Sequence, residues 1–157
     1  MRKGQAAMEF LMTYGWAILV VLAAIAALAY FGVLSPARFL PERCDFPAGL
    51  TCVDKAVISG SANTITMAIR NNVGDTVNIT SASVPAGDNC GSVSAVTIGG
   101  VAPPVAVTNN QLVTVVVTCT TDLAVGDRMK SDLTLNYLRK ETGLIHPSTG
   151  TISGAVN

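Results

Sequence analysis

The apolar residues of this chain follow two different patterns. Residues 10–37 carry no charge, and their many Ala, Leu, Ile and Val side chains leave no polar face at helical spacing. A helix that is apolar all round is typical of a membrane span, which needs about 20 such residues to cross the hydrocarbon core. Gly32 and the Ser35-Pro36 pair end the pattern, because proline disfavours helix at the residue before it. The sequence therefore predicts one long hydrophobic helix that ends at about residue 35.

After the helix, apolar and polar residues alternate in short runs, as in Ile65, Met67 and Ile69. Such runs, separated by turn residues such as Gly99-Gly100 and Gly126-Asp127, are typical of β-strands. The expected strands cover residues 51–59, 64–70, 76–84, 92–98, 112–118, 133–139 and 150–155. About seven strands with this spacing predict an antiparallel, Ig-like β-sandwich head domain over 51–157. The fold class expected for the whole chain is α+β, with one long N-terminal hydrophobic α-helix followed by this head.

Proline and glycine mark the stretch between the helix and the first expected strand, which contains Pro36, Pro41, Pro47 and Gly49. This composition predicts a linker over 36–50. The chain has 157 residues, and 13% of them are charged, against about 25% in typical soluble domains. Its formal net charge is zero, so no charge imbalance favours nucleic acid, and no nucleic-acid partner is expected.

The basic residues predict how the helix is oriented in a membrane. Arg2 and Lys3 precede the apolar run, and the next basic residue is Arg38. Because positive charge is retained on the cytoplasmic side, the N-terminus is expected in the cytoplasm and the head outside. An ordinary secretory signal has an apolar region of about 7–15 residues and a small-residue cleavage site, and neither is present. The sequence therefore predicts a membrane-anchored precursor with an external head.

Four cysteines, Cys44, Cys52, Cys90 and Cys119, all follow the apolar run. An even number of cysteines behind a membrane segment predicts two disulfides formed outside the cytosol. Four cysteines allow three pairings, and Cys44–Cys52 with Cys90–Cys119 is favoured because the first two flank one short loop. A zinc site is the weaker alternative, since no CxxC spacing occurs and the lone histidine, His146, is remote in sequence.

Glu9 is the first acidic residue of the chain, and the next one is Glu42. It lies where the apolar run begins, and a carboxylate at the centre of a membrane span costs about 2.5–3.5 kcal/mol on insertion scales. Cleavage after Gly4 would give Gln5 a cationic amine one helical turn before Glu9. That amine would pair with Glu9 of the same chain or of a neighbouring copy.

Together, Arg2-Lys3-Gly4, Gln5, Glu9 and the long apolar helix resemble the class III signal peptide of type IV pilins and archaellins. The stretch from Lys3 to Leu19, KGQAAMEFLMTYGWAIL, is similar to archaeal type IV pilins in particular. The likeness is close over about the first 35 residues and looser over the β-rich remainder. One position departs from it: where that family often carries Leu, this chain has Thr13.

The resemblance implies a map of the chain and its partners. A prepilin peptidase would remove residues 1–4 by cutting between Gly4 and Gln5, which leaves a hydrophobic helix over 5–35. Gln5 and Glu9 would then act in assembly, in which copies of the chain pack their helices into a filament core. A cytoplasmic assembly ATPase acting through a membrane platform would drive that step. The chain would be a cell-membrane precursor first and part of an extracellular adhesive filament afterwards.

Other functions fit the sequence less well. A subunit of a motility filament shares the leader and a β-rich head with an adhesive pilin, and the sequence does not separate the two. A membrane-tethered binding protein that uses the pilin export route, and a plain single-span anchor, are further alternatives. An enzyme is the weakest, because no nucleophile elbow, phosphate-binding glycine motif or cluster of titratable residues is present. No catalytic residue, metal or cofactor is therefore expected.

Three minor features complete the sequence. Asn78-Ile79-Thr80 is an N-glycosylation sequon, and Asn78 should face solvent if it is modified. His146, followed by Pro147, is expected in a surface turn. Asp122, Asp127 and Asp132 are five residues apart, a spacing that does not match a calcium loop and favours turn and surface roles.

Overall fold

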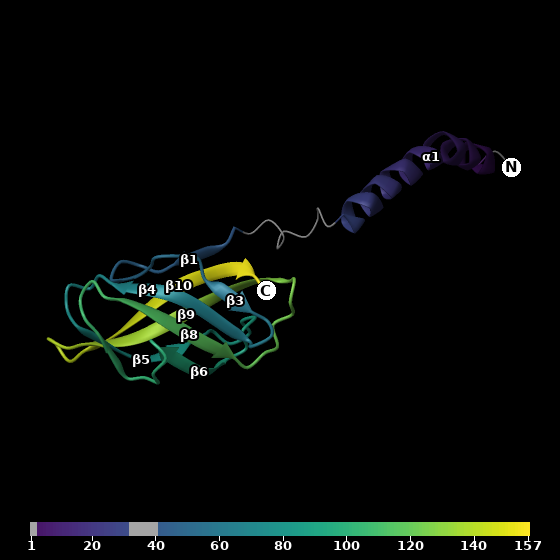
Figure 1. Ribbon diagram of the computed structural model, residues 1–157. Coiled ribbons are helices and arrows are strands. Elements are labelled where there is room, and N and C mark those ends of the chain that lie inside the picture. The colour runs from purple at the N-terminus through teal and green to yellow at the C-terminus, as the bar shows by residue number, and fades with distance from the viewer. Residues whose placement is uncertain (1–2, 32–40) are drawn as a thin grey trace. The chain divides into compact units, whose positions relative to one another are not determined.

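The computed structural model describes residues 3–31 and 41–157 (Figure 1). The chain divides into two compact units, Met1–Phe39 and Leu40–Asn157. Most of the linker expected over 36–50 is therefore part of the second unit, and only its first residues, 36–40, lie outside the described residues.

Helix α1 (Lys3–Tyr30) is the only element of the first unit among its described residues. Helix formers dominate its sequence, and no proline interrupts it. The Thr13 hydroxyl donates a hydrogen bond of 2.8 Å to the Glu9 backbone carbonyl, so its polar group is satisfied within the helix. The expected stop at Gly32 and Ser35-Pro36 lies outside the described residues, and the helix ends just before it.

The second unit consists of ten β-strands in two sheets, all paired antiparallel within their sheets. The first sheet has the order β1-β10-β9-β5-β7, with bounds β1 (Arg43–Asp45), β10 (Ile145–Ala155), β9 (Arg128–Arg139), β5 (Val77–Ser83) and β7 (Val105–Val107). The second sheet has the order β2-β4-β8-β6, with β3 also paired to β4, and bounds β2 (Leu50–Cys52), β3 (Val57–Ser59), β4 (Thr64–Asn71), β6 (Val93–Ile98) and β8 (Leu112–Cys119). The α+β class and the antiparallel sandwich expected from the sequence are confirmed.

The expected count of about seven strands is too low. The strand expected over 51–59 is two strands, because β2 pairs with one end of β4 and β3 with the other. The short strands β1 and β7 were not expected, and β1 lies within the region expected to be a linker. Strands β9 and β10 begin five residues earlier than expected, at Arg128 and Ile145. The first unit contributes none of these strands among its described residues.

One hydrophobic core is formed by residues of both sheets. Alternate residues of the central strands are buried, and the others face solvent or lie half-buried. The second sheet contributes Ile65, Met67, Ile69, Val115 and Val117, and the first contributes Val77, Ile79, Leu133, Leu135 and Ile152. The head therefore buries its own apolar surface, and the alternation read from the sequence is the cause.

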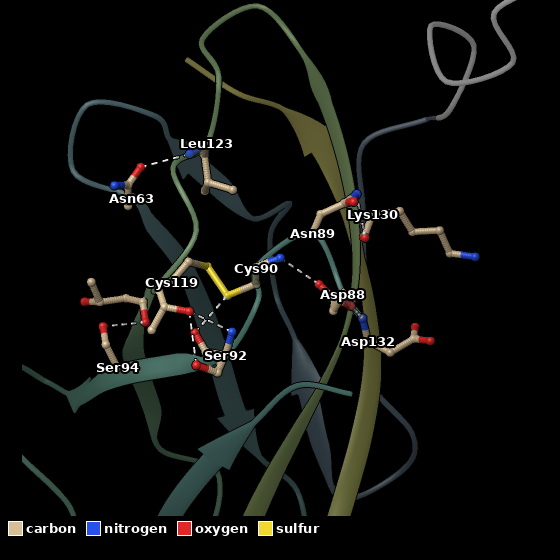
Figure 2. The surroundings of a disulfide bond; sticks show 12 residues. Asn63, Asp88, Asn89, Cys90, Ser92, Ser94, Cys119, Leu123, Lys130 and Asp132 are labelled. Atoms are coloured by element: carbon tan, nitrogen blue, oxygen red, sulfur yellow. Dashed lines mark hydrogen bonds between the residues drawn. A yellow bond between two sulfur atoms is a disulfide. The ribbon is translucent and has the colours of Figure 1, made fainter. Parts of the chain in front are cut away.

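Side chains continue the first sheet where β5 ends. The pairing of β5 with β9 stops at Ser83 and Thr134, although β9 extends to Arg128. Beyond that point the Asp132 backbone N–H donates to the Asp88 carboxylate at 3.2 Å, and the Asn89 amide donates to the Lys130 carbonyl at 3.3 Å (Figure 2). The loop after β5 thereby satisfies backbone groups that a strand would otherwise pair.

The two disulfides differ in burial, since Cys90 and Cys119 are part of the core and Cys44 and Cys52 are half-buried. Cys44 of β1 is bonded to Cys52 of β2, with Cα atoms 5.8 Å apart. Cys90 is bonded to Cys119 at the end of β8, with Cα atoms 4.9 Å apart (Figure 2). This is the pairing that the cysteine spacing favours, and the first bridge joins a strand of one sheet to a strand of the other.

Candidate functional site

The surface of helix α1 is the most unusual feature of the described residues. Between Met8 and Tyr30, every large apolar side chain is exposed. The segment Ala7–Tyr30 has 24 residues and a mean hydropathy of 2.2, so it is long and apolar enough to cross a membrane. At about 1.5 Å per residue it is about 36 Å long, against about 30 Å for the hydrocarbon core of a bilayer.

One face of α1 is hollowed between large side chains. The hollow has a volume of about 340 Å³ and is lined by Phe10, Tyr14, Ala17, Ile18, Val21 and Leu22. The rings of Phe10 and Tyr14 lie 4.9 Å apart and close one end, while Ala17 leaves room at the middle. Its lining residues recur at intervals of three and four along the sequence. This spacing places residues on one face of a helix, so the groove could have been predicted from the sequence. Such a groove accepts a ridge of side chains from another apolar helix.

The sequence-predicted processing and assembly residues all lie on the first turns of α1. The Gly4–Gln5 bond is within the helix, which begins at Lys3. Gln5 and Glu9 are four residues apart in α1, which is about one helical turn. Glu9 is exposed, and its backbone carbonyl, not its carboxylate, accepts the Thr13 hydroxyl. Glu9 is therefore an exposed acidic residue near the start of the apolar segment Ala7–Tyr30.

The sequon lies on the solvent side of the first sheet. Asn78 is the second residue of β5 and lies between Val77 and Ile79, which are both fully buried, so its side chain is on the opposite face. Its neighbours across the sheet are Leu138 of β9 and Ala106 of β7. Asn78 is half-buried between these strands. A glycan attached there would project from the outer face of the first sheet.

The sequence predicted that His146 lies in a surface turn, and this prediction is wrong. It lies in β10, paired with Tyr137 of β9, and the two rings stack with their centroids 5.7 Å apart. The following residue, Pro147, is paired with Asn136 of β9. The pairing of β10 with β1 covers only residues 151–153, so Pro147 has a neighbouring strand on one side. A proline is tolerated there because a strand with one partner has backbone N–H groups that need no ladder bond.

The three aspartates are separated by the fold. Asp122 and Asp127 belong to the loop before β9, while Asp132 is in β9 itself and accepts a hydrogen bond of 2.8 Å from the Thr151 hydroxyl. Within residues 3–31 and 41–157, no group of three or more His, Cys, Asp or Glu side chains is arranged to hold a metal ion. Their contacts are those of loop and surface residues.

One ion pair shifts a pKa in the head. The Lys55 ammonium donates a hydrogen bond to the Glu42 carboxylate. That hydrogen bond, reinforced by the charge of Lys55, holds the pKa of the Glu42 carboxyl below its ordinary value. The pair joins the segment before β1 to the segment between β2 and β3, so it supplements the nearby Cys44–Cys52 bridge.

The chain thus offers two features for comparison with known proteins: an exposed apolar helix and a disulfide-bonded β-sandwich. No protein-family model matches the sequence, and no curated protein matches it either. Any function assigned to the chain therefore depends on its own residues.

Proposed function

We propose that this chain is a structural subunit, a pilin, of an archaeal type IV-like surface filament that serves adhesion. The observation that carries the proposal is the contrast between the two units. The head buries an apolar core between its sheets, whereas α1 exposes every large apolar side chain between Met8 and Tyr30. A helix of this kind needs lipid or other helices around it.

The energetics favour exchange of lipid for copies of the same helix. A large apolar side chain that leaves water for an apolar environment gains about 1.5–3 kcal/mol. Summed over α1, exposure to water would cost on the order of tens of kcal/mol. Packing of many copies side by side reburies this surface, so the helix can leave the membrane only as part of a polymer.

Small residues and the hollow on α1 support close packing of the copies. Gly15 and several alanines allow helix backbones to approach one another. Ridges of a neighbouring α1 would occupy the groove between Phe10 and Leu22. The Glu9 carboxylate would meet the N-terminal amine of Gln5 from a neighbouring copy, which offsets the cost of a buried charge.

The proposal carries with it the partners that the leader implies. A prepilin peptidase acts at Gly4 and Gln5, and an assembly ATPase works through a membrane platform. The precursor is then a membrane protein with a cytoplasmic N-terminus, and the assembled product is extracellular. The two disulfides favour the same external location for the head.

Isolation of surface filaments, followed by mass spectrometry of their subunits, tests the processing step. The expected mature chain begins at Gln5. Filament subunits that retain Met1 would contradict the proposed cleavage. Absence of this chain from surface filaments, in cells that express it, would contradict the function itself.

Substitution of Glu9 tests the assembly role. A Glu9→Ala chain should remain in the membrane but yield far fewer filaments, because the subunit amine loses its partner. Thr13→Val is a matched control, since it changes a polar residue one turn away and keeps the shape and the apolar surface. Unchanged filament yield from Glu9→Ala would count against pairing between Glu9 and a neighbouring copy.

A further inference from the structure

The two ends of the head are fixed by one long β-hairpin. Strands β9 and β10 form eleven residue pairs, from Arg128 opposite Ala155 at one end to Leu138 opposite Ile145 at the other. At about 3.3 Å per residue these ends are about 33 Å apart. The C-terminus is at the first end, and the turn between the two strands is at the second (Figure 1). The chain also enters the head at the first end, since the Ser153 hydroxyl donates to the Pro41 carbonyl.

The turn end presents a tip with apolar and charged side chains. Lys140 is a cation, and the Glu141 carboxylate lies 3.9 Å from the Arg139 guanidinium. Leu144 is 60% exposed and Ile145 is 62% exposed. The Lys140 backbone N–H donates to the Thr76 carbonyl at 3.0 Å, and the Glu141 N–H donates to the Asp75 carboxylate at 3.0 Å. These bonds fix the tip, residues 140–145, against the loop between β4 and β5. In the part of the chain that the structure describes, the Lys140 ammonium makes no ion pair.

The opposite end has a cavity with charged and apolar walls. Its volume is about 270 Å³, and it is lined by residues of the 120–127 loop, the start of β9 and Val156. Asp122 and Asp127 supply carboxylates, Arg128 supplies a guanidinium, and Leu123, Met129 and Val156 supply apolar walls. Two carboxylates and one guanidinium leave one net negative charge in the lining. Val125, in the same loop, is 68% exposed.

This cavity is also preformed. The Leu123 N–H donates to the Asn63 side-chain oxygen at 3.0 Å, and the Asn63 amide donates to the Asp122 carboxylate at 2.8 Å. The Gly126 N–H donates to the Val156 carbonyl at 2.9 Å. Little ordering entropy would be lost when a partner binds, because loop and cavity wall are already held.

We propose that the heads stack end to end, with the 140–145 tip of one copy seated on the cavity and 120–127 loop of the next. The Lys140 stem would lie along the apolar wall, and its ammonium would reach the Asp122 and Asp127 carboxylates. Leu144 and Ile145 would cover Val125. The inference rests on the proposed function, which it deepens by naming a head surface for subunit contact.

The chemistry favours a second copy over a small molecule. Ligand pockets usually measure about 300–1,000 Å³, so a cavity of about 270 Å³ suits one or two side chains better than a ligand. An aliphatic cation matches its walls, and the same chain carries such a cation beside exposed apolar residues at its other end. A contact between two different surfaces of identical subunits can be repeated from copy to copy. It gives a ring when the rotation between subunits closes and an open filament when it does not.

Cross-linking of intact filaments tests the contact. A Val125→Cys/Thr142→Cys chain treated with a short bismaleimide should give a ladder of covalent multimers, because every copy carries both partners. The matched control is Val125→Cys/Thr114→Cys, which moves the second cysteine to the outer face of β8. The control and each single variant should give no species beyond a dimer.

Each result decides between the two proposals. Filaments that form normally but give no ladder would overturn the end-to-end contact and leave the filament subunit intact. A wild-type chain that forms no filament would overturn the proposed function and this contact together. A ladder from the control pair as strong as from the test pair would also overturn the contact.

Charge exchange gives an independent readout. Lys140→Glu and Asp127→Lys should each lower filament yield about fivefold, which is what one exposed ion pair of about 1 kcal/mol supplies. The Lys140→Glu/Asp127→Lys chain should recover part of the lost yield, because the exchange restores one attractive pair while Asp122 keeps its negative charge. A double variant weaker than either single variant would show that these residues do not meet.

Discussion

The Asp88 carboxylate accepts the backbone N–H of Asp132 at 3.2 Å, at the point where β9 has run past the end of β5. Its other oxygen accepts the Cys90 N–H at 3.0 Å. One side chain thus ties the loop after β5 to the edge of the first sheet and positions the Cys90–Cys119 disulfide. The relationship connects a loop residue directly to the stability of the head.

Asp88→Ala should lower the free energy of unfolding of the head by about 2 kcal/mol, since it removes two hydrogen bonds to a charged acceptor. Asp88→Asn should cost less, because one amide oxygen can still accept one N–H. Hydrogen exchange of the detergent-solubilised chain, followed by mass spectrometry across β9, measures the change. Asp54→Ala is the control, as Asp54 is exposed and has no hydrogen bond among the described residues. Equal exchange in Asp88→Ala and wild type would contradict the role.

Asn71 should be among the most sensitive polar residues of the head. It is fully buried, and its amide donates to the carbonyls of Asp75 at 2.8 Å and Val107 at 2.9 Å. Its side-chain oxygen accepts the Val73 N–H at 3.0 Å. Asn71→Ala leaves these groups unpaired and should cost about 3 kcal/mol or more.

The neighbouring residue provides the comparison for that prediction. Asn72 is exposed and donates one side-chain bond to the Thr51 hydroxyl at 2.8 Å, so Asn72→Ala should cost about 1 kcal/mol or less. Chemical unfolding of the two variants under identical conditions measures both values. Similar losses in both variants would show that burial of Asn71 does not set the cost.

Gly150 of β10 has no room for a side chain. A Cβ there would meet the ring of Phe46, and it would lie 2.6 Å from the Asp45 backbone carbonyl. Gly150→Ala should destabilise the head by about 1–3 kcal/mol, because backbone and ring must both move. Gly154→Ala on the same strand is the control, since its closest contact is the end of the Ile58 side chain at 3.2 Å. Thermal unfolding should rank the two in that order, and the reverse order would refute it.

Glu42 should titrate below the ordinary pH range of a glutamate, because Lys55 stabilises its ionised form. A group with a depressed pKa contributes stability above its unfolded pKa and loses it as the pH falls through the folded pKa. Carbon-13 NMR of the Glu42 carboxyl measures the titration directly. Lys55→Met should raise the pKa toward its ordinary value, whereas Lys130→Met, also on the head surface, should leave it in place.

The sequence pattern predicted those elements whose conformation depends on residues close together in the chain. The helix is predictable because a long charge-free run is apolar at every position, and the long strands of the core are predictable from alternation such as Ile65, Met67 and Ile69. Strands β1 and β7 have only three residues each, too few for a pattern, and they exist because β10 and β5 offer backbone partners. Their positions depend on the assembled sheet.

The outer parts of the hairpin formed by β9 and β10 were not recognised as strands in the sequence, because they contain charged residues and a proline. The start of β9 has Arg128, Lys130 and Asp132 on its solvent face and resembles a loop in sequence. The start of β10 contains His146 and Pro147, which resembled a turn. The cavity at the end of the sandwich could not be predicted, because Asn89, Asp122 and Val156 meet there only after the chain has folded.

The Cys44–Cys52 bridge has a mechanical consequence. Tension on the chain ahead of Pro41 reaches the head through β1, a strand of only three residues that pairs with β10 at three positions. The covalent bond passes that load on to β2 and hence to β4, so both layers of the sandwich share it. The head therefore resists unfolding when force is applied at its N-terminal end.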